Sequence, residues 1–180
     1  MPTADLALPT GEKVRLVFLR KYPNLGDMIY LQSSRSGRMK DDSAAAQSYK
    51  NMATIYAGQL AAAVTNRTAT FDALIAPPSS RHDTDVYRDA IVLSSGLRDL
   101  TAGFSRKGKI KAATAKSVEE VINEFDYAPT GSEAKIKSLL IVDESVASGK
   151  TLAAVLHHLR KAGLSKDCQI TVVVAAWLVE

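Results

Sequence analysis

The chain has 180 residues, of which 46% are hydrophobic and 23% charged, proportions that are ordinary for a soluble globular protein and favour a single domain spanning residues 1–180. Its net charge of +4 suits a polyanionic small ligand as well as nucleic acid. The single Cys168 excludes an internal disulfide and a cysteine-based zinc site. No apolar run approaches the roughly 18 residues of a membrane helix. Residues 1–5 lack the basic region of a signal peptide, so we expect a cytoplasmic protein.

The elements predicted along the chain alternate between strands and helices. Two β-prone runs, at residues 14–19 and 28–32, flank a turn-rich segment and predict a hairpin. The later elements are a helix from residue 42 to 64, a strand at 71–76, a helix from about 83, a short helix at 118–125, a strand at 139–142, a helix at 152–159 and a strand at 170–177. This alternation predicts an α/β fold, Rossmann-like, with an open and mainly parallel sheet and helices on both faces.

Residues 139–151, Leu-Leu-Ile-Val-Asp-Glu-Ser-Val-Ala-Ser-Gly-Lys-Thr, carry the strongest functional signal. The first four residues predict a buried strand that ends at Asp143 and Glu144, and a loop of small residues then leads into a helix. Ligands of open α/β sheets bind outside the carboxyl ends of strands, next to helix N-termini. Two acids can hold vicinal hydroxyls, directly or through a metal, while the loop amides bind a phosphate. The segment therefore predicts a sugar-phosphate site.

Two other interpretations of this segment stay open. Residues 148–151 match the end of the P-loop pattern G-x-x-x-x-G-K-[ST]. The first glycine of that pattern would fall at Glu144, whose carboxylate would face a triphosphate, and residues 169–177 contain no acid for a Walker B strand. A plain strand-turn-helix with incidental acids is the other alternative, although paired acids are costly to bury without a partner.

Four hydrophobic residues, two acids and a Ser-Gly-x-Thr loop resemble the phosphoribosyl-diphosphate (PRPP) signature of the type I phosphoribosyltransferases. The resemblance implies the type I phosphoribosyltransferase fold, with its core at residues 71–177 and a small hood at residues 1–40. It implies that Asp143 and Glu144 hold the ribose hydroxyls. The residues implied in binding the 5-phosphate are Ala147, Ser148, Gly149, Lys150 and Thr151, and Val146 is a further implied substrate-binding residue.

Two further segments have a place in the resemblance, which is closest to the competence-associated ComF-type branch. The loop after the strand at 71–76 would hold the diphosphate, and the basic segment 106–116 would be a flexible loop that closes over this leaving group. The residues implied in binding the diphosphate are Ser79, Ser80 and Arg81. The residues implied in catalysis are Glu144, Arg81, Lys107 and Lys109.

The resemblance implies transfer of a phosphoribosyl group to or from a nitrogenous acceptor, with release of diphosphate. Mg²⁺ is the implied cofactor, reached through Asp143 and Glu144, and the implied partners are PRPP or a ribose 5-phosphate compound and a second copy of the chain. No membrane partner is expected. The chain departs from the family pattern where Ala147 replaces a hydroxyl residue, Ser145 an aliphatic one and Glu144 the commoner aspartate. Binding is therefore better supported than turnover.

Two alternative functions stay open. A protein that kept PRPP or nucleotide binding and lost turnover would be a regulator. A ComF-type DNA-uptake accessory protein would contact phosphates through Arg35, Arg38 and the lysines of residues 107–116. The weaker candidates for catalysis are His82, His157 and His158.

Overall fold

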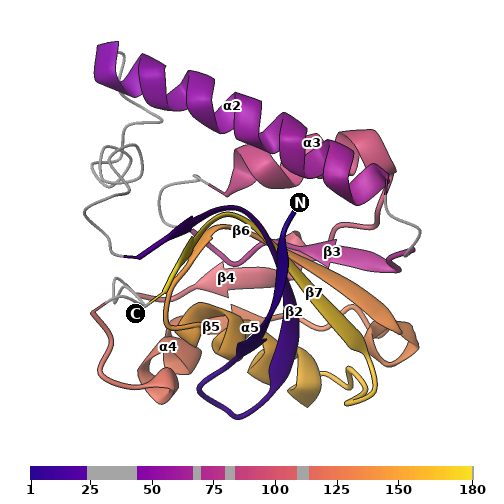
Figure 1. Cartoon of the computed structure of the whole chain (residues 1–180). Coiled ribbons are helices and arrows are strands. Elements are labelled where there is room, and N and C mark those ends of the chain that lie inside the picture. Colours follow the sequence, from indigo (N-terminus) through magenta and orange to yellow (C-terminus); the bar gives the residue numbers. More distant parts are fainter. Residues whose placement is uncertain (24–43, 67–69, 80–83, 109–113, 180) are drawn as a thin grey trace.

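The computed structural model describes residues 1–23, 44–66, 70–79, 84–108 and 114–179. Its main sheet has five strands in the order β1-β2-β7-β6-β3 (Figure 1). Strand β1 is antiparallel to β2, whereas β2, β7, β6 and β3 run parallel to one another. The strands are β1 (Thr3–Ala7), β2 (Lys13–Tyr22), β3 (Ala73–Ile75), β6 (Ser138–Val146) and β7 (Gln169–Leu178).

Helices cover both faces of this sheet. Helices α2 (Ala44–Thr65) and α3 (Asp85–Ser95) pack on one face, and α5 (Lys150–Lys161) packs on the other. Figure 1 shows β2, β6 and β7 arching over α5. Successive residues of β6 alternate between the two cores, with Leu140 facing α2 and Ile141 facing α5. Because both faces are buried, the strand is a continuous apolar run rather than an alternating one.

A small excursion separates α3 from β6. It contains two short antiparallel strands, β4 (Phe104–Arg106) and β5 (Phe125–Tyr127), with α4 (Val118–Glu124) between them. The Ser117 hydroxyl accepts a hydrogen bond from the amide of Glu120 and caps α4. The excursion packs against α5 through Phe104, whose ring meets that of His158 edge to face. One end of the basic segment 106–116 is therefore fixed on a two-stranded ribbon.

The structure confirms an α/β architecture with a mostly parallel sheet and helices on both faces. It also differs from the sequence prediction, and two of the differences concern the signature strand and the N-terminal residues. The signature strand does not end at Val142 but continues through both acids to Val146, because β6 stays hydrogen-bonded to β7 along that stretch. Residues 13–22 belong to the main sheet rather than to a separate hood, because β2 pairs in parallel with β7. The predicted strand at residues 28–32 lies outside the described residues.

Helix α5 illustrates how the sequence forms these elements. Its apolar positions Leu152, Leu156 and Leu159 are buried against the sheet, and Arg160 and Lys161 lie in the last turn, where positive charge opposes the helix dipole. Gly163 follows with a φ of +104°, a conformation that ends the helix at little steric cost. None of the helices in the described part of the chain combines the length and apolarity that a membrane crossing requires.

Candidate functional site

The topology creates a switch point between β3 and β6. These strands are neighbours, with Ile75 paired to Ile141. The chain that leaves β3 forms α3 on one face of the sheet, and the chain that leaves β6 forms α5 on the opposite face. Ligands of open α/β sheets bind in the crevice that such a divergence opens at the carboxyl ends of the strands. The loop after β3 and the segment after Val142 both lie at this edge.

Asp143 and Glu144 lie inside β6, and both are half-buried. Asp143 pairs with Val174 of β7, and its Oδ1 accepts a hydrogen bond of 2.7 Å from the amide of Glu144. The Oε1 of Glu144 accepts a hydrogen bond of 2.6 Å from the hydroxyl of Tyr49 on α2. Because successive side chains of a strand point to opposite faces, the two carboxylates leave β6 toward different sides.

The predicted phosphate loop joins β6 to α5. Val146 is buried, Ala147 and Ser148 are exposed, and Gly149 adopts a left-handed conformation with a φ of +71°. Gly149 is the cap residue of α5, and its carbonyl accepts the first helical hydrogen bond from Ala153 at 2.9 Å. Since glycine has no side chain to cap the first helical amides, these N–H groups can serve an anion. The loop geometry suits a phosphate.

Lys150 does not extend along this loop. Its Nζ donates a hydrogen bond of 2.7 Å to the backbone carbonyl of Ala115. This contact ties the first residue of α5 to the end of the basic segment 106–116. The lysine of a P-loop instead presents its charge to the β- and γ-phosphates of a nucleotide. Lys150 is thus already engaged in a contact between two parts of the chain.

The loop after β3 is described only in part. Ala76 and Pro77 are buried, and the Ala76 amide donates to the Thr101 hydroxyl at 2.9 Å, so this amide is not free for a diphosphate. Ser79 is half-buried and lies in the loop that follows β3, the strand that pairs with β6. The remaining predicted diphosphate ligands, Ser80 and Arg81, lie outside the described residues.

Of the two lysines predicted to act on the leaving group, only Lys107 is described. Its side chain is 52% exposed, and its Nζ lies 2.6 Å from the Asp126 carboxylate on β5. The Lys107 amide also donates to the Glu124 carbonyl at 2.8 Å, which holds the backbone on the β4–β5 ribbon. The charge of Lys107 is therefore paired locally in this conformation. Lys109 lies outside the described residues.

The described histidines and Cys168 lie away from the edge between β3 and β6. A ring nitrogen of His158 lies 3.0 Å from the Ile122 carbonyl, so this residue links α5 to α4, while His157 is exposed. His82 lies outside the described residues. Burial raises the pKa of the Cys168 thiol, which disfavours thiolate chemistry there.

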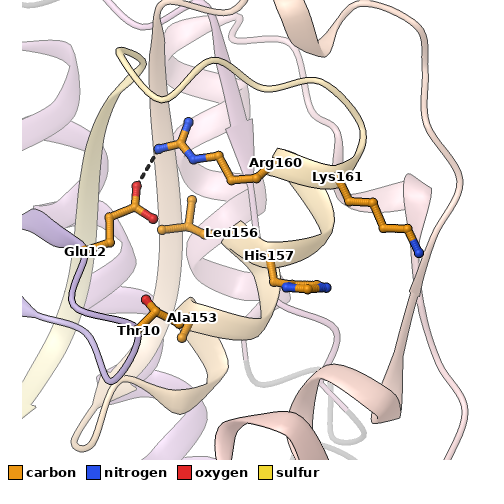
Figure 2. Close-up of a pocket in the computed structure, with 7 residues that line it drawn as sticks. All are labelled: Thr10, Glu12, Ala153, Leu156, His157, Arg160 and Lys161. Carbon is orange, nitrogen blue, oxygen red and sulfur yellow. Dashed lines mark hydrogen bonds and ion pairs between the residues drawn. The ribbon is translucent and has the colours of Figure 1, made fainter.

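A pocket of about 360 Å³ lies between α5 and the turn that joins β1 to β2, and neither acid of the pair lines it (Figure 2). The turn between β1 and β2 forms one wall, and the carboxylate of Glu12 pairs there with the guanidinium of Arg160. The same guanidinium also donates to the carbonyl of Ser165. The ion pair between Glu12 and Arg160 thus links the β1–β2 turn to α5.

The structure adds two polar partners that the sequence did not single out. Tyr49 lies in the helix predicted at residues 42–64 but belongs to no functional motif, and Thr101 belongs to none either. Both act across long sequence separations, on Glu144 and Ala76 respectively. In the described part of the chain, no three His, Cys, Asp or Glu side chains are grouped to hold a metal ion.

Comparison with models of known protein families gives no match, and comparison with the curated proteins gives none either. The function is therefore inferred from the residues of the chain and their geometry.

Proposed function

We propose that this chain binds PRPP at the edge between β3 and β6 and transfers its phosphoribosyl group to or from a nitrogenous acceptor, with a type I phosphoribosyltransferase fold. One observation carries the proposal. An Asp-Glu pair at the switch point of the sheet leads directly into a left-handed glycine that caps an α-helix. Carboxylates that accept hydrogen bonds from hydroxyl groups, and helical amides that donate hydrogen bonds to a phosphate, suit the two ends of a ribose 5-phosphate.

The proposed reaction forms a bond between the acceptor nitrogen and C1 of the ribose, while the bond from C1 to diphosphate breaks and the acceptor loses a proton. Positive charge develops on the ribose ring, and negative charge develops on the leaving diphosphate. In this proposal Asp143 and Glu144 stabilise and orient the ribose, and the amides at the start of α5 hold its 5-phosphate. Catalysis would come mainly from positioning and electrostatic stabilisation.

The donor set is compatible with Mg²⁺. This ion prefers oxygen ligands and is usually bound through one or two carboxylates, several waters and the phosphates of the substrate. Asp143 and Glu144 would supply the carboxylates, so a cluster of three acidic or histidine side chains is not required. The bound ion would neutralise charge on the diphosphate and help to hold the ribose hydroxyls.

A P-loop function is less compatible with these contacts. The ammonium group of Lys150 is engaged by the Ala115 carbonyl, and Glu144 stands where a P-loop has its first glycine. A carboxylate at that position would repel a triphosphate. These two features support a ribose phosphate over a nucleoside triphosphate as the ligand.

Isothermal titration of the protein with PRPP and Mg²⁺ tests the proposal. We expect saturable binding, and we expect the double variant Asp143→Asn, Glu144→Gln to lose at least tenfold in affinity, or ~1.4 kcal/mol. Both acids are half-buried at the end of the sheet, so the variant should remain folded, which thermal unfolding would check. Unchanged affinity in the folded double variant would refute the assignment.

A diphosphate-release assay over purine and pyrimidine bases then separates turnover from binding alone. Release that depends on one base identifies the acceptor. Tight PRPP binding with no diphosphate release in the presence of any base identifies a PRPP-sensing regulator. The missing hydroxyl at Ala147 would favour this outcome. Salt-sensitive DNA binding with no affinity for PRPP would replace the proposal with a DNA-uptake role.

A further inference from the structure

Tyr49 makes a long-range contact with the acidic pair. The residue lies on α2 and is only 2% exposed, and its hydroxyl donates to Glu144 Oε1 at 2.6 Å. A hydrogen bond from a phenol to a carboxylate is short and strong because the acceptor is charged. The ring packs in the core between α2, α3 and the sheet, so the donor is held in one place.

The position of Glu144 explains why such a donor is needed. Glu144 follows Leu140 and Val142 on the face of β6 that packs against α2, but it retains solvent-accessible surface. A glutamate side chain has three rotatable bonds, and fixing it costs conformational free energy. The Tyr49 hydroxyl fixes one oxygen of the carboxylate before any ligand arrives, so less ordering is left for the binding step.

We propose that Tyr49 is a positioning residue, which orients the Glu144 carboxylate to accept hydroxyl groups of the ribose. This inference rests on the proposed function. It makes α2 part of the ligand site, although none of the residues in the sequence motif lies on that helix. Tyr49 acts through Glu144 and does not itself touch the substrate.

The chain supplies a matched control at another site. Tyr127 also donates its hydroxyl to a glutamate, Glu133, at 2.6 Å, within the β5 to η4 (Glu133–Lys135) region. Tyr49→Phe and Tyr127→Phe therefore remove the same atom from the same type of hydrogen bond. Only the first bond involves a residue of the acidic pair.

Titration calorimetry with three ligands tests the inference. We expect Tyr49→Phe to weaken PRPP with Mg²⁺ and ribose 5-phosphate at least fivefold each, while the affinity for inorganic diphosphate without Mg²⁺, a ligand with no ribose, stays within twofold. We expect Tyr127→Phe to lower the melting temperature and to leave all three affinities unchanged. A general loss of structure in Tyr49→Phe would instead weaken all three ligands together, and that result would overturn the inference.

A double-mutant cycle shows whether Tyr49 acts through Glu144. In a Glu144→Ala background, which removes the acceptor of the Tyr49 hydroxyl, Tyr49→Phe should cause no further loss of ribose 5-phosphate affinity. An equal loss in both backgrounds, or wild-type affinity in Tyr49→Phe, would refute the positioning role. If the wild-type protein binds neither PRPP nor ribose 5-phosphate, the proposed function itself fails, so the two failures are distinguishable.

Discussion

Gly149 combines two constraints at a single residue. Its φ of +71° is a conformation that side-chain-bearing residues adopt at a cost of roughly 1–2 kcal/mol. A Cβ built on it would also lie 3.0 Å from Leu8 Cδ2 in the turn between β1 and β2. The positive φ of Gly149 and the contact with Leu8 therefore both constrain the loop between β6 and α5.

The first residue-scale prediction is that Gly149→Val lowers the affinity for ribose 5-phosphate and PRPP together, by more than ~1.4 kcal/mol or tenfold. The reason is that a branched side chain cannot keep the left-handed conformation that presents the amides of α5. Titration calorimetry on the folded variant measures this loss.

Gly149→Ala in a Leu8→Ala background separates the two constraints. Shortening Leu8 removes the steric contact but leaves the positive φ, so affinity should stay low. Recovery of wild-type affinity in that double variant would show that the packing, and not the glycine conformation, controls the loop.

A second residue-scale prediction concerns Lys150 and Thr151. The Lys150 ammonium group is engaged by the Ala115 carbonyl, so Lys150→Ala should reduce PRPP affinity only about two- to threefold. Thr151→Val removes a hydroxyl donor from the start of α5 and should cost more, roughly tenfold, as expected for a hydrogen bond to a charged group. Calorimetric titration of both variants measures the difference.

The wild-type protein should also show no ATP hydrolysis. ATPase activity that disappears in Lys150→Ala would reverse the choice between a ribose phosphate site and a P-loop.

At the scale of elements, Glu133 organises the short 3₁₀ helix η4 after β5. Its Oε1 accepts hydrogen bonds from the Tyr127 hydroxyl at 2.6 Å, the Thr130 amide at 2.7 Å and the Thr130 hydroxyl at 2.9 Å. Burial alone would raise the pKa of Glu133, but these hydrogen bonds outweigh it and lower the pKa to about 2. The ionised form therefore stabilises the fold.

The stabilisation from Glu133 should depend on pH in a defined direction. Since the folded-state pKa lies below the ordinary value of 4.5, the contribution is fully present above that value and is lost as the pH falls toward 2. Glu133→Gln should lower the free energy of unfolding at pH 7 by about 2 kcal/mol, with allowance for solvent screening. Urea unfolding at pH 7 and pH 3 should show this difference shrinking at the lower pH. A constant difference would contradict the assignment.

At the scale of the whole molecule, elements with strong periodicity were predictable and those with weak patterns were not. Helical periodicity predicted α2 at residues 42–64, and the continuous apolar run before Asp143 predicted a buried parallel strand. Strand β1 was missed because it is a sheet edge in which only Leu6 is buried. β4 and β5 have three residues each, which is too short for a pattern to emerge.

The candidate site was predictable where it is local in sequence. The acids, the glycine loop and the start of α5 occupy a single run of residues. Their residue types and their spacing in the sequence were therefore enough to predict a site there. The extension of β6 through the acids could not be predicted, because it depends on hydrogen bonds to β7 rather than on the polarity of Asp143 and Glu144. The contact from Tyr49 to Glu144 likewise exists only once α2 has packed on the sheet.

The pairing of β2 with β7 also sets the order in which the sheet can be completed during synthesis. The β1–β2 hairpin leaves the ribosome early, but β7 is its only link to the other parallel strands among the described residues. An isolated hairpin is at best marginally stable, so Leu16 and Phe18 have no lasting cover until residues 169–178 have been made. Formation of β7 therefore completes two pairings at once. It pairs with β2, and it pairs with the stretch of β6 that carries the acids.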